Sequence, residues 1–586
     1  MNRTCSAVNL SFLLWLNLPR PSIRQILACP LRFMVGIAAV LLTAMPTPAA
    51  ERIKFSYPPF GDFTVNVEDL EIFAKEGRIT NNFAFYAQRV PPEQLAIFRQ
   101  FLNRQFTISP VTVSQFTYSP TGEIVLERLG RIIQTEIRKN GDIALRSTLI
   151  TTAANPKGFN AIDLLRQFPS RDIWLDLPAS LEIANSAAQI FQQRDRIVTT
   201  IRQQAQLEAV NNPQPDLSNL PNLQVPGSQR VSRQLSLLIT NPQRSVPVPV
   251  NLYFPQLKSS PSPVIVISHG IASDRQTFDY LAQHLTSYGF VVALLEHPET
   301  SSERFERFLA GLEGSPDATD IVSRPLDIRY LLDELERRNQ VDPDLRGRMN
   351  LQQVGLIGQS FGGYTVLASG GAVIPEEQLR QGLGPLCQTQ NLDFNLSMLL
   401  QCRATDLPLK TYDLRDDRVK AVIAINPVGS NWFGKAGLAQ LKVPVMLISG
   451  TDDYFAPPVP EQVHPFSWLT SPNKYLLLVD QGTHFSFLGA SRTEIFSVPQ
   501  GLIGPSPNVA RPYLQALSVA FFNTYLENET SYRAYLTEPY IESMSTPPLD
   551  LDLITSLTEA QIIQADSVPL QTQPPPVAPI TVSPPK

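Results

Sequence analysis

Six short runs of almost continuous apolar residues constrain the fold of this chain more than any other feature. They alternate with helical stretches through the middle and later parts of the sequence. Strands of this kind are buried on both faces, which indicates a mostly parallel sheet covered by helices. We therefore predict an α/β fold built on a doubly wound sheet. The runs cover residues 264–268, 290–295, 354–358, 419–425, 445–449 and 475–479.

Two segments before these runs predict an antiparallel hairpin. They are RVSRQLSLLITNP, which begins at Arg230, and SVPVPVNLYFP, which begins at Ser245. The prolines of the second segment place the hairpin at the edge of the sheet, because an edge strand tolerates proline. A doubly wound sheet can also bind a dinucleotide, but no G-x-G-x-x-G motif follows the first run. A dehydrogenase is therefore disfavoured.

The stretch VGLIGQSFGGYTV, residues 354–366, contains a Gly-x-Ser-x-Gly pattern centred on Ser360. A buried strand leads into the serine and a helix opens directly after it. A nucleophilic serine on a tight strand-to-helix turn needs this context, and only glycine allows strand and helix to approach so closely. The alternative is a small residue in a glycine-rich turn. We favour a nucleophile.

A serine nucleophile needs a histidine base, and the chain has five histidines. His269, His284 and His297 precede Ser360, and His464 lies in a proline-flanked segment without a strand before it. His484 follows the last apolar run, where a strand delivers it to the carboxyl edge of the sheet. It is therefore our predicted base. The alternative is a buried structural histidine, since a neutral imidazole is easily buried.

The acid that orients the base is expected between Ser360 and His484 in the sequence. The segment VPVMLISGTDDYFAP offers Asp452 and Asp453 at the end of a predicted strand. Asp453 is favoured because it lies three residues after Gly450 and four before Pro457, a common spacing for this loop. We expect Asp452 to cap the turn, as aspartates often do.

With these motifs in place, residues 231–526 resemble an α/β hydrolase, with local detail similar to the platelet-activating-factor acetylhydrolase branch. The resemblance rests on PVIVISHGIASDRQTFDYLAQHLTSYGFVVALLEHPE, on SRPLDIRYLLDEL and on GQSFGG. It implies an oxyanion hole formed by the backbone N–H groups of Phe361 and Ile271, aimed at the charge of the tetrahedral intermediate. It also implies a structural role for His269.

One position departs from the resembled branch. Its mammalian plasma members place their acid after the sixth strand, where VKAVIAINPV has Asn426. A neutral amide cannot stabilise an imidazolium as a carboxylate does, so the acid role falls to Asp453. A short-chain phospholipid acetyl ester is therefore not assumed as the substrate.

Composition and terminal segments predict the domain order. With 586 residues, 43% hydrophobic and 17% charged, the chain is long enough for two or more domains. Its start has arginines, a short apolar run at 33–45 and then PTPAA, a pattern typical of a secretory signal cleaved near Ala49 or Ala50. The predicted order is a signal peptide at 1–50, a helical N-terminal domain at 51–210, a Pro-rich linker at 211–229, the hydrolase domain with cap insertions at 230–545 and a Pro-rich tail at 546–586.

Export changes how the cysteines are interpreted. Cys5 and Cys29 leave with the signal, so the mature chain keeps Cys387 and Cys402. They lie in the insertion at 371–418, which in hydrolases often forms a cap over the active site. An oxidising compartment makes them a candidate disulfide. Two reduced cysteines packed as small hydrophobic residues are the alternative.

The region 51–210 has helical signals throughout, including PPEQLAIFRQFLNRQF and the long run LPASLEIANSAAQIFQQRDRIVTTIRQQAQLEAV. It contains no histidine or cysteine, which excludes the usual zinc arrangements there. It resembles a helical domain of unknown function found in front of bacterial hydrolases. A lid, a partner dock, a membrane-surface element or simple protection of the hydrolase all remain open as its role.

We predict an exported serine carboxylic-ester hydrolase that acts on small acyl or lipid esters through an acyl-enzyme, with no metal or cofactor. The alternatives are an acyltransferase with the same triad and a non-catalytic binding or assembly protein on a hydrolase scaffold. A net charge of −5 gives no reason to expect a nucleic-acid partner. The oligomeric state stays open.

Overall fold

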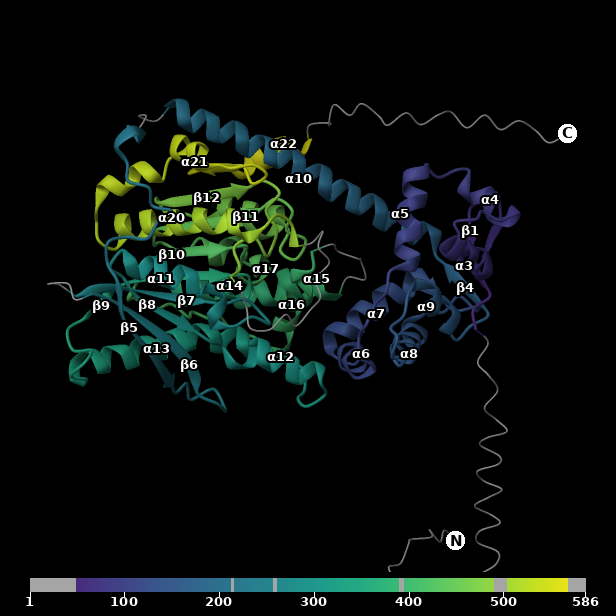
Figure 1. Ribbon diagram of the computed structural model, residues 1–586, viewed down its shortest axis with the longest axis horizontal. Helices are drawn as coiled ribbons and strands as arrows, with labels where there is room; N and C mark the ends of the chain where they lie inside the picture. Colours follow the sequence, from purple (N-terminus) through teal and green to yellow (C-terminus); the bar gives the residue numbers. More distant parts are fainter. Residues whose placement is uncertain (1–48, 212–215, 257–260, 389–394, 490–502, 568–586) are drawn as a thin grey trace, which may run out of the picture.

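The computed structural model describes residues 49–211, 216–256, 261–388, 395–489 and 503–567 (Figure 1). Most of the predicted signal peptide and the end of the predicted tail lie outside these residues. The described chain forms a large α/β part and a smaller N-terminal domain, joined by one long helix. Among the described residues, no helix combines the length and apolar character needed to cross a membrane.

A nine-stranded mixed sheet forms the centre of the α/β part and confirms the predicted fold. Its strand order is β13-β12-β11-β10-β9-β7-β8-β6-β5, and the neighbours from β8 to β12 run parallel. Each of the six apolar runs became a strand, and the predicted hairpin is the antiparallel pair β5 and β6 at one edge. The strands are β5 Val231–Ile239, β6 Val248–Pro255, β7 Ser262–Ser268, β8 Val291–Leu295, β9 Met349–Gln359, β10 Val419–Ile425, β11 Val445–Gly450, β12 Lys474–Val479 and β13 Leu551–Ile554.

Helices cover both faces of this sheet because both faces of its strands are apolar. In β7, Val264 and Val266 join one core, while Ile265 and Ile267 join the other. Helices α13, α14 and α17 pack on the first face and α11 and α20 on the second. The helices of this part are α11 Asp279–Ser287, α12 Ser302–Leu309, α13 Asp320–Val341, α14 Phe361–Gly370, α15 Gly384–Gln388, α16 Ser397–Gln401, α17 Ser430–Leu438, α18 His464–Trp468, α20 Pro507–Tyr525, α21 Glu538–Met544 and α22 Glu559–Ser567.

The sheet continues beyond residue 545, where the sequence predicted the start of a tail. Strand β13 pairs antiparallel with β12, and its residues Leu551 and Leu553 are buried in the core. Helix α22 follows and packs against the long helix α10. The tail was predicted from the proline-rich end of the chain, QTQPPPVAPITVSPPK. The α/β part therefore extends to residue 567.

The N-terminal domain, predicted to be mainly helical, combines helices with a small sheet that was not predicted from the sequence. It contains a four-stranded sheet of order β2-β1-β4-β3. The alternating segments RIKFS and DFTVN, separated by a turn at Pro58, Pro59 and Gly61, were the sequence signal for its hairpin. The elements are β1 Arg52–Ser56, β2 Asp62–Asn66, α3 Val67–Glu76, α4 Asn81–Ala87, α5 Pro92–Asn103, α6 Pro110–Thr117, α7 Pro120–Ile132, β3 Ile133–Gln134, α8 Asp142–Ala153, α9 Ala161–Gln167 and β4 Asp172–Leu175.

Helix α10, Leu177–Asn211, joins the two parts and crosses the predicted boundary at residue 210 (Figure 1). Its residues Ile197, Ile201 and Ala205 are buried in the core of the α/β part. Near its end, the Glu208 carboxylate accepts hydrogen bonds from Thr555 just after β13, at 2.8 and 2.7 Å. The second half of α10 is therefore a structural element of the α/β part.

The predicted linker at 211–229 also packs on the α/β part, apart from residues 212–215, which lie outside the described chain. Leu223 is buried in the core, and its carbonyl oxygen contacts His284 Nε2 at 3.0 Å. The Gly227 N–H donates to Ser287 Oγ at 2.7 Å.

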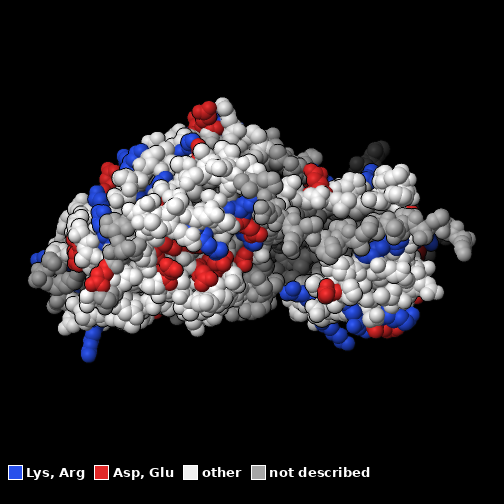
Figure 2. All heavy atoms as spheres, turned by 90° about the horizontal axis from the view of Figure 1, so that it is seen from above, with Lys and Arg blue, Asp and Glu red and all other residues white. Residues whose placement is uncertain are grey.

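Seen from above in Figure 2, charged side chains of both signs are scattered between larger uncharged areas, so the described residues on this face form no broad basic surface.

The insertion after α14 carries the cysteines and is fastened to the α/β part. Cys387 and Cys402 form a disulfide with a Cα–Cα distance of 5.5 Å. By reducing the entropy of the unfolded chain, a bond that closes a loop of this length stabilises the folded state by about 3 kcal/mol. Glu461 anchors the same insertion through hydrogen bonds. Its buried carboxylate accepts hydrogen bonds from Ser397 and Gln401 at 2.9 and 2.8 Å and from the Gly429 N–H at 3.1 Å.

Candidate active site

Ser360 lies on a strained turn between β9 and α14. Its backbone has φ 57° and ψ −118°, in a region that side-chain-bearing residues rarely adopt and that costs on the order of 1–3 kcal/mol. The flanking glycines are required by space. A Cβ on Gly358 would lie 2.0 Å from the Gly362 carbonyl oxygen, and one on Gly362 would lie 2.1 Å from that of Ser268. The turn therefore has the form of the predicted nucleophile elbow.

Asp453 and His484 meet at the carboxyl edge of the sheet. Asp453 follows β11 and His484 follows β12, and Asp453 Oδ2 lies 2.6 Å from His484 Nδ1. The other oxygen of Asp453 accepts the N–H groups of Phe455 and Ala456, both at 2.8 Å. We assign the Nδ1 proton to His484 because its partner is a carboxylate, which leaves Nε2 as the free acceptor. The imidazole is thus oriented for work as a base.

The elbow and the His484 loop are neighbours. Gln359, directly before Ser360, donates from Nε2 to the His484 carbonyl oxygen at 3.2 Å. Ser360 itself is 4% exposed, and the His484 side chain is 11% exposed. No hydrogen bond joins the Ser360 hydroxyl to the His484 ring, although both residues are described. In hydrolases without substrate this bond is often long and tightens when substrate enters.

The loop after β7 lies against Ser360. A Cβ on Gly270 would lie 3.2 Å from Ser360 Cβ, so the Gly270–Ile271 backbone passes next to the serine. Phe361 opens α14 directly after Ser360. The structure thereby places both predicted oxyanion donors, the N–H groups of Ile271 and Phe361, on segments that border Ser360. Ala272, the next residue of this loop, has a positive φ of 55°.

Asn426 has a tethering role that the sequence did not reveal. It is buried at the end of β10, and its Nδ2 donates to the Thr483 carbonyl oxygen at 3.1 Å. Its Oδ1 accepts the Gly450 N–H at 3.0 Å. One amide therefore ties the loop of the base to the strand end of the acid. A carboxylate here could accept from Gly450 but could not donate to Thr483.

Asp452 does not cap the turn as predicted, because Asp453 itself accepts the two turn N–H groups. Asp452 instead forms an ion pair with Arg194 of α10, at 2.7 Å. Burial raises the pKa of Asp452 and the charge of Arg194 lowers it. Next to this pair, the Phe191 and Tyr454 rings meet edge to face at 6.1 Å. Helix α10 thus contacts the loop that carries Asp453.

Arg194 and Asn426 were not predicted as site residues, and their signals differ. Asn426 was noted in the sequence for lacking a charge, and its position directly after a buried strand pointed to the sheet edge. Arg194 lies in the continuous polar run QQRDR, where no local pattern distinguishes it from its neighbours. Among the described residues, no group of three or more His, Cys, Asp and Glu side chains is arranged to hold a metal ion.

Comparison with known proteins matches two separate parts of the chain to hydrolase family models. Residues 49–176 match the family model described as "Alpha/beta hydrolase of unknown function (DUF1400)". Residues 217–309 match the model for platelet-activating factor acetylhydrolase, isoform II. A similar protein, the platelet-activating factor acetylhydrolase of Cavia porcellus, is 25% identical over 152 residues. That alignment covers 21% of this chain and 35% of the relative, so the chain spans about a third of the protein it matches.

These matches confirm the predicted resemblance and support a hydrolase. The second model covers β7, the loop with Ile271 and strand β8, and ends before the Ser360 elbow. The matched region thus includes Ile271 but not Ser360, Asp453 or His484. The matched region and the site geometry lead to the same class of protein.

Proposed function

We propose that this chain, an α/β hydrolase similar to platelet-activating factor acetylhydrolases, cleaves carboxylic esters through an acyl-enzyme formed on Ser360. The observation that carries the proposal is the 2.6 Å contact between Asp453 and His484 next to the strained serine turn. Residues of the three required types, in the order Ser, Asp, His, follow β9, β11 and β12 at the carboxyl edge of the sheet, where this fold does its chemistry.

The proposed reaction has two halves. In the first, Ser360 Oγ attacks the ester carbonyl carbon, its proton passes to His484 Nε2, and Asp453 stabilises the resulting imidazolium. The N–H groups of Phe361 and Ile271 donate to the carbonyl oxygen as it becomes negative. The alkoxide leaves with the proton from His484. In the second half, water repeats the sequence on the acyl-enzyme and releases the carboxylic acid and free Ser360.

We expect the mature protein to hydrolyse p-nitrophenyl esters from acetate to octanoate and to leave the matching p-nitroanilides almost untouched. Phenolate and alkoxide leaving groups depart more readily than amines, so a serine triad without amide-specific features favours esters. A chain-length series of initial rates measures this, with the Ser360→Ala protein as the blank. A preference for palmitate, or amide turnover equal to ester turnover, would contradict it.

We further propose that the protein is exported, which the disulfide supports because such bonds persist in oxidising compartments. Cys387 and Cys402 are then expected to be oxidised inside intact cells. Acid trapping followed by thiol alkylation and mass spectrometry measures this, with a reduced sample as the control. Alkylation of both cysteines without prior reduction would place the chain in a reducing compartment.

A further inference from the structure

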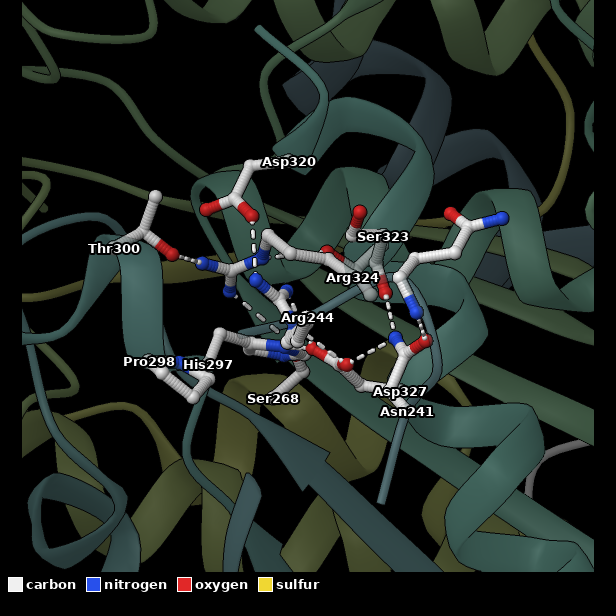
Figure 3. Close-up of polar contacts among 12 residues, drawn as sticks. Asn241, Arg244, Ser268, His297, Pro298, Thr300, Asp320, Ser323, Arg324 and Asp327 are labelled. Atoms are coloured by element: carbon white, nitrogen blue, oxygen red, sulfur yellow. Dashed lines mark hydrogen bonds and ion pairs between the residues drawn. The ribbon is translucent and has the colours of Figure 1, made fainter. Parts of the chain in front are cut away.

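Arg324 is a fully buried cation of helix α13, with 0% of its surface exposed. It lies beside Arg244, and two aspartates of the same helix balance the two charges (Figure 3). Arg244 forms ion pairs with Asp320 and Asp327 at 2.7 and 2.6 Å. Burial lowers the pKa of Arg324 to about 9, and Asp320 raises it, so the group is a cation at neutral pH. A buried guanidinium is costly to dehydrate, so its hydrogen bonds indicate what it does.

The guanidinium of Arg324 bonds to both segments that border Ser360. On the side of β7, Nη2 donates to the His269 carbonyl oxygen. On the side of α14, Nε donates to Thr365 Oγ1 at 3.1 Å, and the guanidinium lies 4.5 Å from the ring centroid of Phe361. Thr365 Oγ1 in turn donates to the Phe361 carbonyl oxygen at 2.8 Å. One planar group therefore joins the two segments that carry the proposed oxyanion donors.

The far end of the oxyanion loop is held through Thr300. Arg324 Nη1 donates to Thr300 Oγ1 at 2.6 Å, as Figure 3 shows. The Thr300 carbonyl oxygen accepts the N–H of Ala272 at 2.9 Å. Arg324 thus holds His269 directly and Ala272 through one residue. Gly270 and Ile271 lie between these two anchors.

Two buried histidines complete the support of this loop. The His297 N–H donates to His269 Nε2 at 3.0 Å, so His269 carries its proton on Nδ1, which donates to the Gly270 carbonyl oxygen at 2.6 Å. The His297 ring bridges Ser268 Oγ at 2.8 Å and Asp327 Oδ2 at 2.7 Å. Burial and then the charge of Arg324 lower the pKa of both histidines, so both are neutral. Ser268, His297 and Asp327 repeat the residue types of a triad, but all three are fully buried.

We infer that Arg324 is a positioning residue that sets the separation of the Phe361 and Ile271 N–H groups. The inference rests on the proposed ester hydrolysis at Ser360. A backbone oxyanion hole works only if both donors are held where the negative oxygen will form. The fork of a guanidinium can bridge three acceptors in fixed geometry, which a lysine ammonium on a flexible stem cannot do.

The test compares Arg324→Met with Arg418→Met. Arg418 is another largely buried arginine, 14% exposed and paired with Asp416 at 2.6 Å, and it lies at the opposite end of β10 from Ser360. We expect Arg324→Met to lower kcat for p-nitrophenyl acetate about 100-fold, comparable to the loss of one oxyanion donor, with KM nearly unchanged. Arg418→Met is expected to keep kcat. The kcat of Arg324→Lys should be as low as that of Arg324→Met, because the inference assigns the effect to the fork of the guanidinium rather than to its charge.

A thionoester substrate separates positioning from general damage. Its sulfur is a weaker hydrogen-bond acceptor than oxygen, so a displaced oxyanion hole lowers the turnover of the thionoester less than that of the oxoester. If Arg324→Met does not fold, Thr300→Val and Thr365→Val replace it, since each removes one acceptor and leaves the buried charges in place. Each is expected to lower kcat about tenfold with KM unchanged, a loss of the size that one ordinary hydrogen bond contributes.

The outcomes are distinguishable. Wild-type kcat in a folded Arg324→Met protein, or in the Thr300→Val and Thr365→Val proteins that replace it, overturns the inference. An equal loss of turnover on the oxoester and the thionoester also overturns it. A wild-type protein that neither turns over esters nor reacts with a fluorophosphonate at Ser360 overturns the proposed function and this inference with it. Wild-type turnover with a selective oxoester loss in the variants supports both.

Discussion

Replacing Ser360 with alanine is expected to abolish covalent labelling by a fluorophosphonate probe and to lower ester turnover on the order of 10⁶-fold. The reason is that the probe and the ester both react with the Ser360 hydroxyl, whose strained turn presents it next to Asp453 and His484. Labelling is measured by mass spectrometry of the modified peptide, and turnover with p-nitrophenyl acetate.

Ser369→Ala is the matched control for this experiment. Ser369 lies on the same helix, is fully buried, and its hydroxyl makes no hydrogen bond among the described residues. Its replacement should leave both labelling and turnover intact. If the Ser360→Ala protein were labelled as strongly as the wild type, Ser360 would not be the nucleophile. The experiment would then give no reason to prefer an enzyme over a non-catalytic scaffold.

Replacing Asp453 with asparagine is expected to lower kcat on the order of 10⁴-fold, as in other triads that lose the charge of their acid. An amide cannot both hold His484 in the tautomer with a free Nε2 and stabilise the imidazolium. The fold should persist, because the amide oxygen can still accept the N–H groups of Phe455 and Ala456. Steady-state kinetics together with a thermal unfolding curve separate the two effects.

Asp452→Asn tests the same loop without touching the base. Asp452 is partly exposed and pairs with Arg194, and such pairs contribute about 0–1 kcal/mol. Its replacement is expected to change kcat by less than about tenfold, in line with that small energy. If Asp452→Asn proved more damaging than Asp453→Asn, the assignment of the acid would be reversed.

Local patterns in the sequence were sufficient for the strands and for the order of the candidate triad. The run 445–449 is apolar on both faces, so it could only be a central strand, and Asp453 follows its end by a few residues. The same holds for the run 475–479 and His484. In a parallel sheet every strand ends at the same edge, so residues after neighbouring strands meet without further information. Gly358 and Gly362 added the tight turn at Ser360.

Contacts between distant parts of the chain were beyond these patterns. The pairing of Arg194 with Asp452 joins residues 258 positions apart, and the bond between Arg324 and Thr365 spans 41. The position of β13 on β12 was equally hidden, because its four residues are too few to stand out behind a proline-rich segment. Asp320, Arg324 and Asp327 stand four and three positions apart in the sequence, a spacing that places them on one face of a helix. Only the packed structure decided that they balance one another there, because the cost of burying a charge depends on partners that other segments supply.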